Sequence, residues 1–426
     1  MRKILSVMLV VLACSATLFA SGEKESGENG KTILKVANYA LLESGYEQFW
    51  KDVEINFEAD NPNVDIQWVT APYGEIMNQV INMAGGGDKV DAIFSEIDWI
   101  PGFEDAGLAA PINDILPQSF LDDLYPDVMK AFEIDNKAYG VPLYISPYVL
   151  YYNKALFEKA GLDPNMPPKT YDEMLEMAKE LSELKDSNGN KVYAFGQTTA
   201  SVPVSGSSGN AMIFNFGGSV LDDNGNLSVD NKGFKDAISM LKKLDDYSYN
   251  PQNAKLKDLR NLFALEQLAM YYDQSWGFNG IQSINPDARN FAASAAPLTG
   301  GNGSGQSLLQ SHCFILVDNG DARKDALSKF VQYVISADVL GDYLANLTPA
   351  YPAIKSMEGM EAIDNNPVLK GAAASASNVK AQPFIPQLKD INLELCTLAQ
   401  AVTVGDEDVA SAISDFKKRA QSKLSE

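Results

Sequence analysis

Apolar residues along this chain follow two spacings in turn, one typical of β-strands and the other typical of α-helices. Residues 33–40 predict a strand, and Phe49, Val53 and Phe57 then recur at the spacing of one helix face. The same order repeats as a half-buried strand at 64–68, a helix at 73–81 that ends at three glycines, and a short buried strand at 92–94. Strands and helices in alternation favour an α/β protein with mostly parallel sheets.

The pattern continues past Tyr144, where we place the beginning of a second lobe. Thr170 and Glu173 have the spacing of a capping box at the start of an amphipathic helix. Further strands are predicted at 192–195, 268–272 and 312–317, and further helices at 234–241, 326–334 and 409–416. Residues 300–305 (GGNGSG) predict a flexible crossing between lobes.

The first 20 residues have the order of a secretory signal peptide. Two basic residues precede an apolar run at 4–13, and small residues continue to Ala20. This run is too short to span a bilayer as an ordinary helix. Cys14 ends a stretch that resembles a loose bacterial lipobox, so lipidation at Cys14 is an alternative to the preferred cleavage after Ala20. Residues 21–30 are polar and glycine-rich, which predicts a flexible linker.

Composition narrows the possible functions of the rest of the chain. The formal net charge of −22 argues against a nucleic-acid partner and against adsorption to anionic lipid. Cys313 and Cys396 are too few for a disulfide framework, and we expect two free or buried thiols. The single histidine, His312, has no second histidine for a zinc site and no nucleophile motif around it. We therefore expect no metal, no cofactor and no catalysis, which favours a protein that binds a ligand.

Several segments in order along the chain resemble motifs of one family. They are 139–144 (YGVPLY), 150–157 (LYYNKALF), 161–173 (GLDPNMPPKTYDE), 263–277 (FALEQLAMYYDQSWG), 324–340 and 349–352 (PAYP). Together they resemble the extracellular solute-binding proteins of sugar ABC importers, of the maltose-binding protein type. Each segment is weak evidence alone, but their shared order over most of the chain is specific.

This resemblance implies an α/β, two-lobed periplasmic-binding-protein fold (type II) with a ligand cleft between the lobes. It also implies a carbohydrate ligand, the membrane subunits of an ABC permease as partner, a monomer and a location in the periplasm or cell envelope. We place the crossings near Ile145, Pro297 and Ala337, so that lobe 1 comprises 31–145 plus 297–336 and lobe 2 comprises 146–296 plus 337–426. Hinge closure around the ligand would signal occupancy to the permease.

The candidate ligand contacts combine aromatic platforms with hydrogen-bonding groups, because a pyranose has apolar faces and a rim of hydroxyls. The resemblance implies that Trp276 stacks on the sugar and that Asp98 binds hydroxyls. Core packing is the alternative for Trp276, and a helix N-cap is the alternative for Asp98. The full candidate set is Asn38, Tyr39, Tyr73, Glu96, Asp98, Trp99, Tyr144, Ser146, Gln197, Asp273, Trp276, His312 and Tyr351.

Departures from the family pattern keep the identity of the sugar open. Ser146 stands where a malto-oligosaccharide receptor has a glutamate, and Asn392 or a neighbour stands where it has a late tryptophan. An exported glycoside hydrolase would also need aromatic residues and two carboxylates. A receptor of the same fold for a non-sugar solute is the third hypothesis. The absence of arginine from the candidate loops disfavours an anionic solute.

Overall fold

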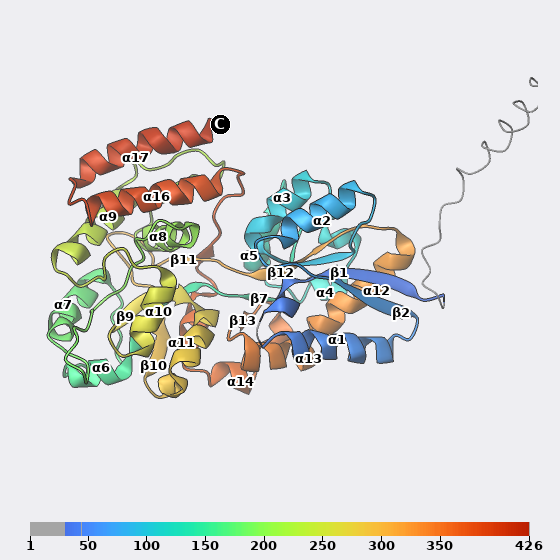
Figure 1. Cartoon of the computed structure of the whole chain (residues 1–426), viewed down its shortest axis with the longest axis horizontal. Helices are drawn as coiled ribbons and strands as arrows, with labels where there is room; N and C mark the ends of the chain where they lie inside the picture. The colour runs from blue at the N-terminus through green and yellow to red at the C-terminus, as the bar shows by residue number, and fades with distance from the viewer. Residues whose placement is uncertain (1–29, 44, 426) are drawn as a thin grey trace, which may run out of the picture.

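The computed structural model describes residues 30–43 and 45–425. The predicted signal peptide, the lipidation candidate Cys14 and all but the last residue of the predicted linker lie outside the described residues. Across the described part of the chain, no helix has both the length and the apolar character needed to cross a membrane. Figure 1 shows two lobes, with β1, β2, α1 and α12 in one and α6 to α11 together with α16 and α17 in the other.

The first lobe contains a five-stranded mixed sheet in the order β2-β1-β3-β12-β6. Its strands are β1 (Thr32–Ala37), β2 (Val64–Val69), β3 (Ala92–Glu96), β6 (Val141–Pro142) and β12 (His312–Leu316). β1 pairs in parallel with β2 and β3, while β12 runs antiparallel to both β3 and β6. The helices predicted around 49–57, 73–81 and 326–334 form as α1 (Glu47–Asp60), α2 (Ile76–Gly85) and α12 (Asp321–Val334).

The first strand is shorter than the apolar pattern predicts. It ends at Ala37, because the Asn38 side chain accepts a hydrogen bond from the backbone N–H of Ala40 at 2.8 Å and caps the short helix η1 (Tyr39–Leu42). Asn38 is fully buried, so this cap is also part of the core. The cap turns Tyr39 away from the strand direction at the edge of the sheet where parallel strands end.

The second lobe is built on the three-stranded sheet β10-β8-β9. Its strands are β8 (Tyr148–Asn153), β9 (Met270–Gln274) and β10 (Ala292–Ala295). β8 is antiparallel to both neighbours, so the prediction of mostly parallel sheets is wrong for this lobe. The predicted strand at 192–195 is also wrong: Tyr193 and Gly196 form only isolated bridges, which link them to Leu268 and Tyr271.

Helices cover the second sheet, and the predicted capping box is present in modified form. The main helices are α6 (Lys154–Lys159), α7 (Tyr171–Ser182), α8 (Pro203–Asn215), α9 (Lys232–Asp246), α10 (Leu256–Ala264), α11 (Phe278–Ile284), α16 (Leu388–Val402) and α17 (Val409–Leu424). The Thr170 hydroxyl accepts from the N–H of Glu173 at 3.0 Å. The Glu173 carboxylate accepts from the N–H of Lys169, one residue earlier than in a standard capping box.

Two large hydrophobic cores match the two lobes. The first includes buried residues from 34–145 and 309–369, and the second includes buried residues from 148–308 and 391–420. A third, smaller cluster joins second-lobe residues from 149–292 to Val368 and Ala372. Residues such as Leu340 and Met357 pack in the first core, although the prediction assigned everything after 336 to lobe 2. The lobe boundaries stay a prediction, and we propose to move the third crossing from Ala337 to residues 363–372, where Ile363 and Leu369 pack in the first core and Val368 and Ala372 pack with the second lobe.

Candidate functional site

A cavity of about 1210 Å³ lies between the two lobes, a volume that suits a small ligand of one or several rings. The first lobe contributes η1, the loop before α2, the ends of β3 and β12, and residues 343–348. The second lobe contributes the starts of α8, α10 and α16 and the ends of β8 and β9 nearest the other lobe. The cavity therefore lies where strand ends and helix N-termini meet, as ligand sites in α/β proteins commonly do.

Three aromatic side chains form one wall of the cavity on the first lobe. The ring centroid of Tyr39 lies 5.1 Å from that of Tyr73 and 5.8 Å from that of Trp99, and Tyr73 lies 5.3 Å from Trp99. Rings this close pack edge-to-face or tilted against one another. They therefore present one continuous apolar surface to the cavity.

A hydrogen-bond network lies directly behind this wall and is centred on His312. The Tyr39 hydroxyl is 3.2 Å from Nε2 of His312, and the Tyr144 hydroxyl bonds to Nδ1. The Glu96 carboxylate lies 3.5 Å from Nε2 and also accepts from the Tyr73 hydroxyl at 3.0 Å. The network fixes the orientation of the aromatic wall and leaves Glu96 half-buried at the cavity.

Asp98 is an exposed carboxylate that lines the cavity on the first lobe. It follows β3 in the short helix η2 (Ile97–Trp99) and is exposed, so solvent reaches it. The surrounding protein and the Glu96 carboxylate raise the pKa of Asp98, although a hydrogen bond from Gln310 opposes the rise. Because the Asp98 side chain is in contact with solvent, its pKa rises less than that of a fully buried carboxyl would. A carboxylate in this position can accept hydrogen bonds from ligand hydroxyls.

Trp276 forms the platform on the opposite wall, and Arg260 lies over one face of it. The guanidinium carbon is 4.7 Å from the centroid of the Trp276 ring, within the range of a cation–π contact. Arg260 comes from α10, whereas Trp276 follows β9. The indole is only partly buried and lines the cavity, so a second face remains available to a ligand.

Asp273 holds this arginine in place and does not line the cavity. Its fully buried carboxylate accepts from Nε of Arg260 at 2.6 Å and from a terminal nitrogen at 2.8 Å. The hydroxyl of Tyr271 and the backbone N–H of Gln274 also donate to it. Burial lowers the pKa of Arg260 but the Asp273 carboxylate outweighs it, so the net shift is upward.

The structure brings most of the candidate residues together in this cavity. Those that line it are Tyr39, Tyr73, Glu96, Asp98, Trp99, Tyr144, Trp276 and His312. The lining does not include Asn38, Ser146, Gln197, Asp273 or Tyr351. The role of each residue as a ligand contact stays a prediction.

The candidates outside the lining have other partners. The Ser146 hydroxyl is 2.9 Å from that of Ser275, and Tyr351 pairs with Ile145 in a two-residue ladder between the lobes. Gln197 is buried beside a separate cavity of about 20 Å³, where its side-chain nitrogen donates to Ser208. In this structure these three residues therefore lie outside the cavity lining, and their roles as ligand contacts stay predictions.

Sequence reasoning missed a group of cavity residues, most of them on the second lobe. They are Glu43, Tyr46, Tyr148, Lys255, Lys257, Arg260, Gln274, Gln310 and Lys389. The candidate loops contain no arginine, but Arg260 reaches the cavity from within a helix, so the argument against an anionic solute is weaker than the loops alone indicate. The signal that could have identified these residues was the start of each helix, because helix N-termini are common ligand-binding positions.

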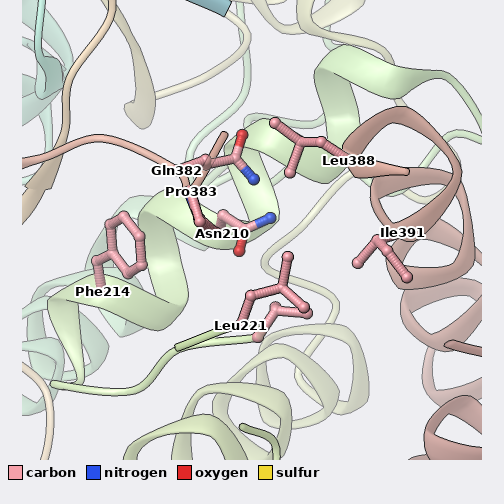
Figure 2. Close-up of a pocket in the computed structure, with 8 residues that line it drawn as sticks. Asn210, Phe214, Leu221, Gln382, Pro383, Leu388 and Ile391 are labelled. Carbon is pink, nitrogen blue, oxygen red and sulfur yellow. The ribbon is translucent and has the colours of Figure 1, made fainter. Parts of the chain in front are cut away.

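A second, smaller cavity lies wholly within the second lobe, and Figure 2 shows its lining. Asn210 of α8 and Gln382 both approach Asn392 of α16, with nitrogen–oxygen distances of 2.9 Å and 3.1 Å. The cavity volume of about 10 Å³ has room for about one water molecule. It is a packing gap and cannot hold a sugar.

Thiols and acidic side chains are the groups through which a protein of this composition could bind a metal or undergo redox chemistry. Cys313 and Cys396 are buried and free, which confirms the prediction from their number. Within residues 30–43 and 45–425, no group of three or more histidine, cysteine, aspartate or glutamate side chains could hold a metal ion.

Comparisons with known proteins agree with this architecture. The profile of the bacterial extracellular solute-binding protein family matches residues 39–340. The galactooligosaccharide-binding protein of Bacillus subtilis is 23% identical over 445 residues, which covers 100% of this chain and 98% of that protein.

Solved structures show the same fold at low sequence identity. The cyclic alpha-maltosyl-1,6-maltose binding protein of Arthrobacter globiformis has a TM-score of 0.80 and 20% identity, over 93% of this chain and 99% of that chain. The Mycobacterium tuberculosis protein UgpB in complex with glycerophosphocholine has a TM-score of 0.76 and 20% identity, over 93% and 99%. The fold thus occurs with both sugar and non-sugar ligands.

Proposed function

Because this chain belongs to the bacterial extracellular solute-binding protein family, we propose that it is the substrate-binding component of an ABC importer for a mono- or oligosaccharide. The cavity between the lobes carries this proposal. Trp276 on one side and the wall of Tyr39, Tyr73 and Trp99 on the other offer apolar surfaces to sugar rings. Asp98 and Glu96 accept hydrogen bonds from the hydroxyls at the edge of the ring.

Lobe closure would couple binding to transport. The two cores are separate, and the chain passes between them through short segments such as β7 (Tyr144–Ile145), which pairs with β13 (Tyr351–Pro352). A hinge in these segments would bring the two walls of the cavity onto the ligand. The closed form would then dock on the membrane subunits of the permease, with the protein exported to the periplasm or cell envelope as a monomer.

The protein performs no hydrolysis in this proposal. A glycosidase places two carboxyl groups on either side of the bond that it cleaves. The carboxylates that line the cavity, Glu43, Glu96 and Asp98, all belong to the first lobe. Asp273, the acidic residue beneath the opposite wall, forms an ion pair with Arg260.

A non-sugar solute is the second candidate, and the charge of the second lobe favours it. Lys255, Lys257 and Lys389 line the cavity beside the N-termini of α10 and α16. Ammonium groups and helix N-termini together attract anions. A solute with a phosphate or carboxylate group could therefore bind this wall.

A ligand screen tests both candidates. The chain from residue 21 is heated with each member of a panel of mono- and oligosaccharides, glycerol 3-phosphate and glycerophosphocholine. A sugar at about 100 times its Kd should stabilise the protein by about 2.7 kcal/mol. Stabilisation by the phosphate compounds alone would replace the sugar with an anionic solute. Release of chromophore from nitrophenyl glycosides would contradict the binding role and support a hydrolase.

A further inference from the structure

Two buried polar atoms that line the cavity have no hydrogen-bond partner among the described residues. They are the hydroxyl of Tyr148 and the side-chain oxygen of Gln274. Tyr148 is 1% exposed and Gln274 is 6% exposed, so bulk water does not replace the missing partners. A buried polar atom without a partner costs about 1–3 kcal/mol, and native proteins keep few of them.

The two residues face each other across neighbouring strands. Tyr148 begins β8 and Gln274 ends β9, and the two are direct partners in the antiparallel register. Side chains of directly opposite residues in such a ladder point to the same face and have Cβ atoms about 5 Å apart. The pair therefore forms one small polar spot at the base of the cavity, two residues before Trp276.

Neighbouring polar groups are already used within the protein. The hydroxyls of Ser146 and Ser275 bond to each other at 2.9 Å. The hydroxyl of Tyr151 donates to the backbone oxygens of Gln274 and Ser275 at 3.2 Å and 2.7 Å. Other buried atoms without a partner occur in the described part of the chain, but only these two belong to residues that line the cavity.

The chemistry of the pair selects one kind of ligand group. Burial raises the pKa of Tyr148, so its phenol stays protonated and can donate, whereas an amide oxygen only accepts. Of these two atoms, an anion could use only the phenol, while an ammonium group could donate to both oxygens but could not accept the phenol proton. A hydroxyl group can accept from one and donate to the other.

We infer that Tyr148 and Gln274 together bind a single hydroxyl group of the ligand at the base of the cleft. This inference rests on the proposed function, since it assigns a specific contact within the same site. The pair makes the hydroxyl a condition of tight binding, because a ligand without it would bury both protein atoms unpaired. Stacking on Trp276 alone would not discriminate in this way.

The test uses two near-isosteric variants and one control. Tyr148→Phe removes the donor and Gln274→Met removes the acceptor. Tyr152→Phe removes a hydroxyl from the same face of β8 at a position that does not line the cavity. Binding is measured by calorimetry with the tightest-binding sugar of a panel of glucose, galactose, maltose, maltotriose, cellobiose and galactobiose, and with the monodeoxy analogues of that sugar.

We expect each cavity variant to bind the sugar at least about tenfold more weakly, and the control to bind it like the wild type. One monodeoxy analogue should bind the wild type at least about tenfold more weakly than the parent sugar. The double variant, Tyr148→Phe with Gln274→Met, should bind that analogue and the parent sugar with equal affinity. Without ligand, the melting temperatures of both single variants should equal or exceed that of the wild type, because each removes an unpaired buried atom.

The possible results separate this inference from the proposed function. If Tyr148→Phe and Gln274→Met both bind the sugar as tightly as the wild type does, the inference is wrong and the proposed function stands. If both variants melt several degrees lower without ligand, the two atoms have structural partners and the inference is wrong. If no sugar of the panel binds the wild type, the proposed function fails and the inference fails with it.

Discussion

The ion pair between Asp273 and Arg260 provides a direct test of how the Trp276 platform is held. Asp273→Asn keeps the size of the side chain but removes its charge. The Asp273 side chain is 0% exposed and that of Arg260 is 16% exposed, so the guanidinium would keep a positive charge in a mostly buried position. Removing one partner of a buried pair costs about 3–5 kcal/mol. We expect about 3 kcal/mol, at the low end of that range, because Arg260 keeps some contact with solvent.

Thermal unfolding followed by calorimetry measures this loss. For a lobe of roughly 150–250 residues, a loss of about 3 kcal/mol lowers the Tm by about 6–12 °C. The control is the double variant Asp273→Asn with Arg260→Met, which leaves no charge in the pair. Neutral replacements of both partners often restore stability, so the double variant should lie within about 1 kcal/mol of the wild type.

Two results would refute this reasoning. A loss below about 1 kcal/mol in the single variant would mean that solvent compensates the arginine, so that the pair contributes as little as a surface ion pair. A double variant no more stable than the single one would mean that Asp273 acts through its bonds to Tyr271 and Gln274 rather than through the charge of Arg260.

Three further predictions concern other parts of the molecule. Trp276→Leu should weaken sugar binding at least about tenfold in a fluorescence or calorimetric titration, because it removes the stacking surface; unchanged affinity would exclude this platform. Burial raises the pKa of Asp91 from 3.8 to about 6. As the pH rises, this carboxyl therefore ionises in the unfolded chain before it ionises in the folded protein, and the free energy of unfolding falls between these two pH values. Relative to the wild type, Asp91→Asn should therefore gain on the order of 3 kcal/mol between pH 4 and pH 7 in urea unfolding, and a constant difference would contradict this. Gly206→Ala should destabilise by about 1–3 kcal/mol, because its Cβ would lie 2.3 Å from the backbone oxygen of Asn392; a neutral effect on urea unfolding would show that α8 and α16 can separate.

The sequence predicts well those elements whose signals are local. The helix that begins after Thr170 and the strand around residues 64–68 follow from capping and alternation, which depend on residues close in sequence. The antiparallel direction of β8 was not predictable in this way. Its partners, Met270–Gln274 and Ala292–Ala295, lie more than 100 residues away, and strand direction depends on how the chain crosses between the lobes.

The site shows the same limit at the level of single residues. The family resemblance identified Trp276 and Asp98 as candidates, and both line the cavity. The candidate set contains Asp273 and not its neighbour Gln274, although adjacent residues of a strand point to opposite faces. Gln274 lines the cavity, while Asp273 faces the other side of β9 and pairs with Arg260. A shift of one position in the strand thus exchanges a supporting residue for a cavity residue.

The order β2-β1-β3-β12-β6 has a consequence for how the protein is made. β6 ends at Pro142, but β12, which lies between β3 and β6, begins only at His312. While the ribosome is synthesising the second lobe, the first sheet lacks an interior strand and the edges of β3 and β6 have no partner. Contacts this distant in sequence form slowly, and unpaired strand edges favour aggregation. The nascent chain therefore depends on late residues for the completion of its earliest domain, and a chaperone that covers those edges would protect it until His312 emerges.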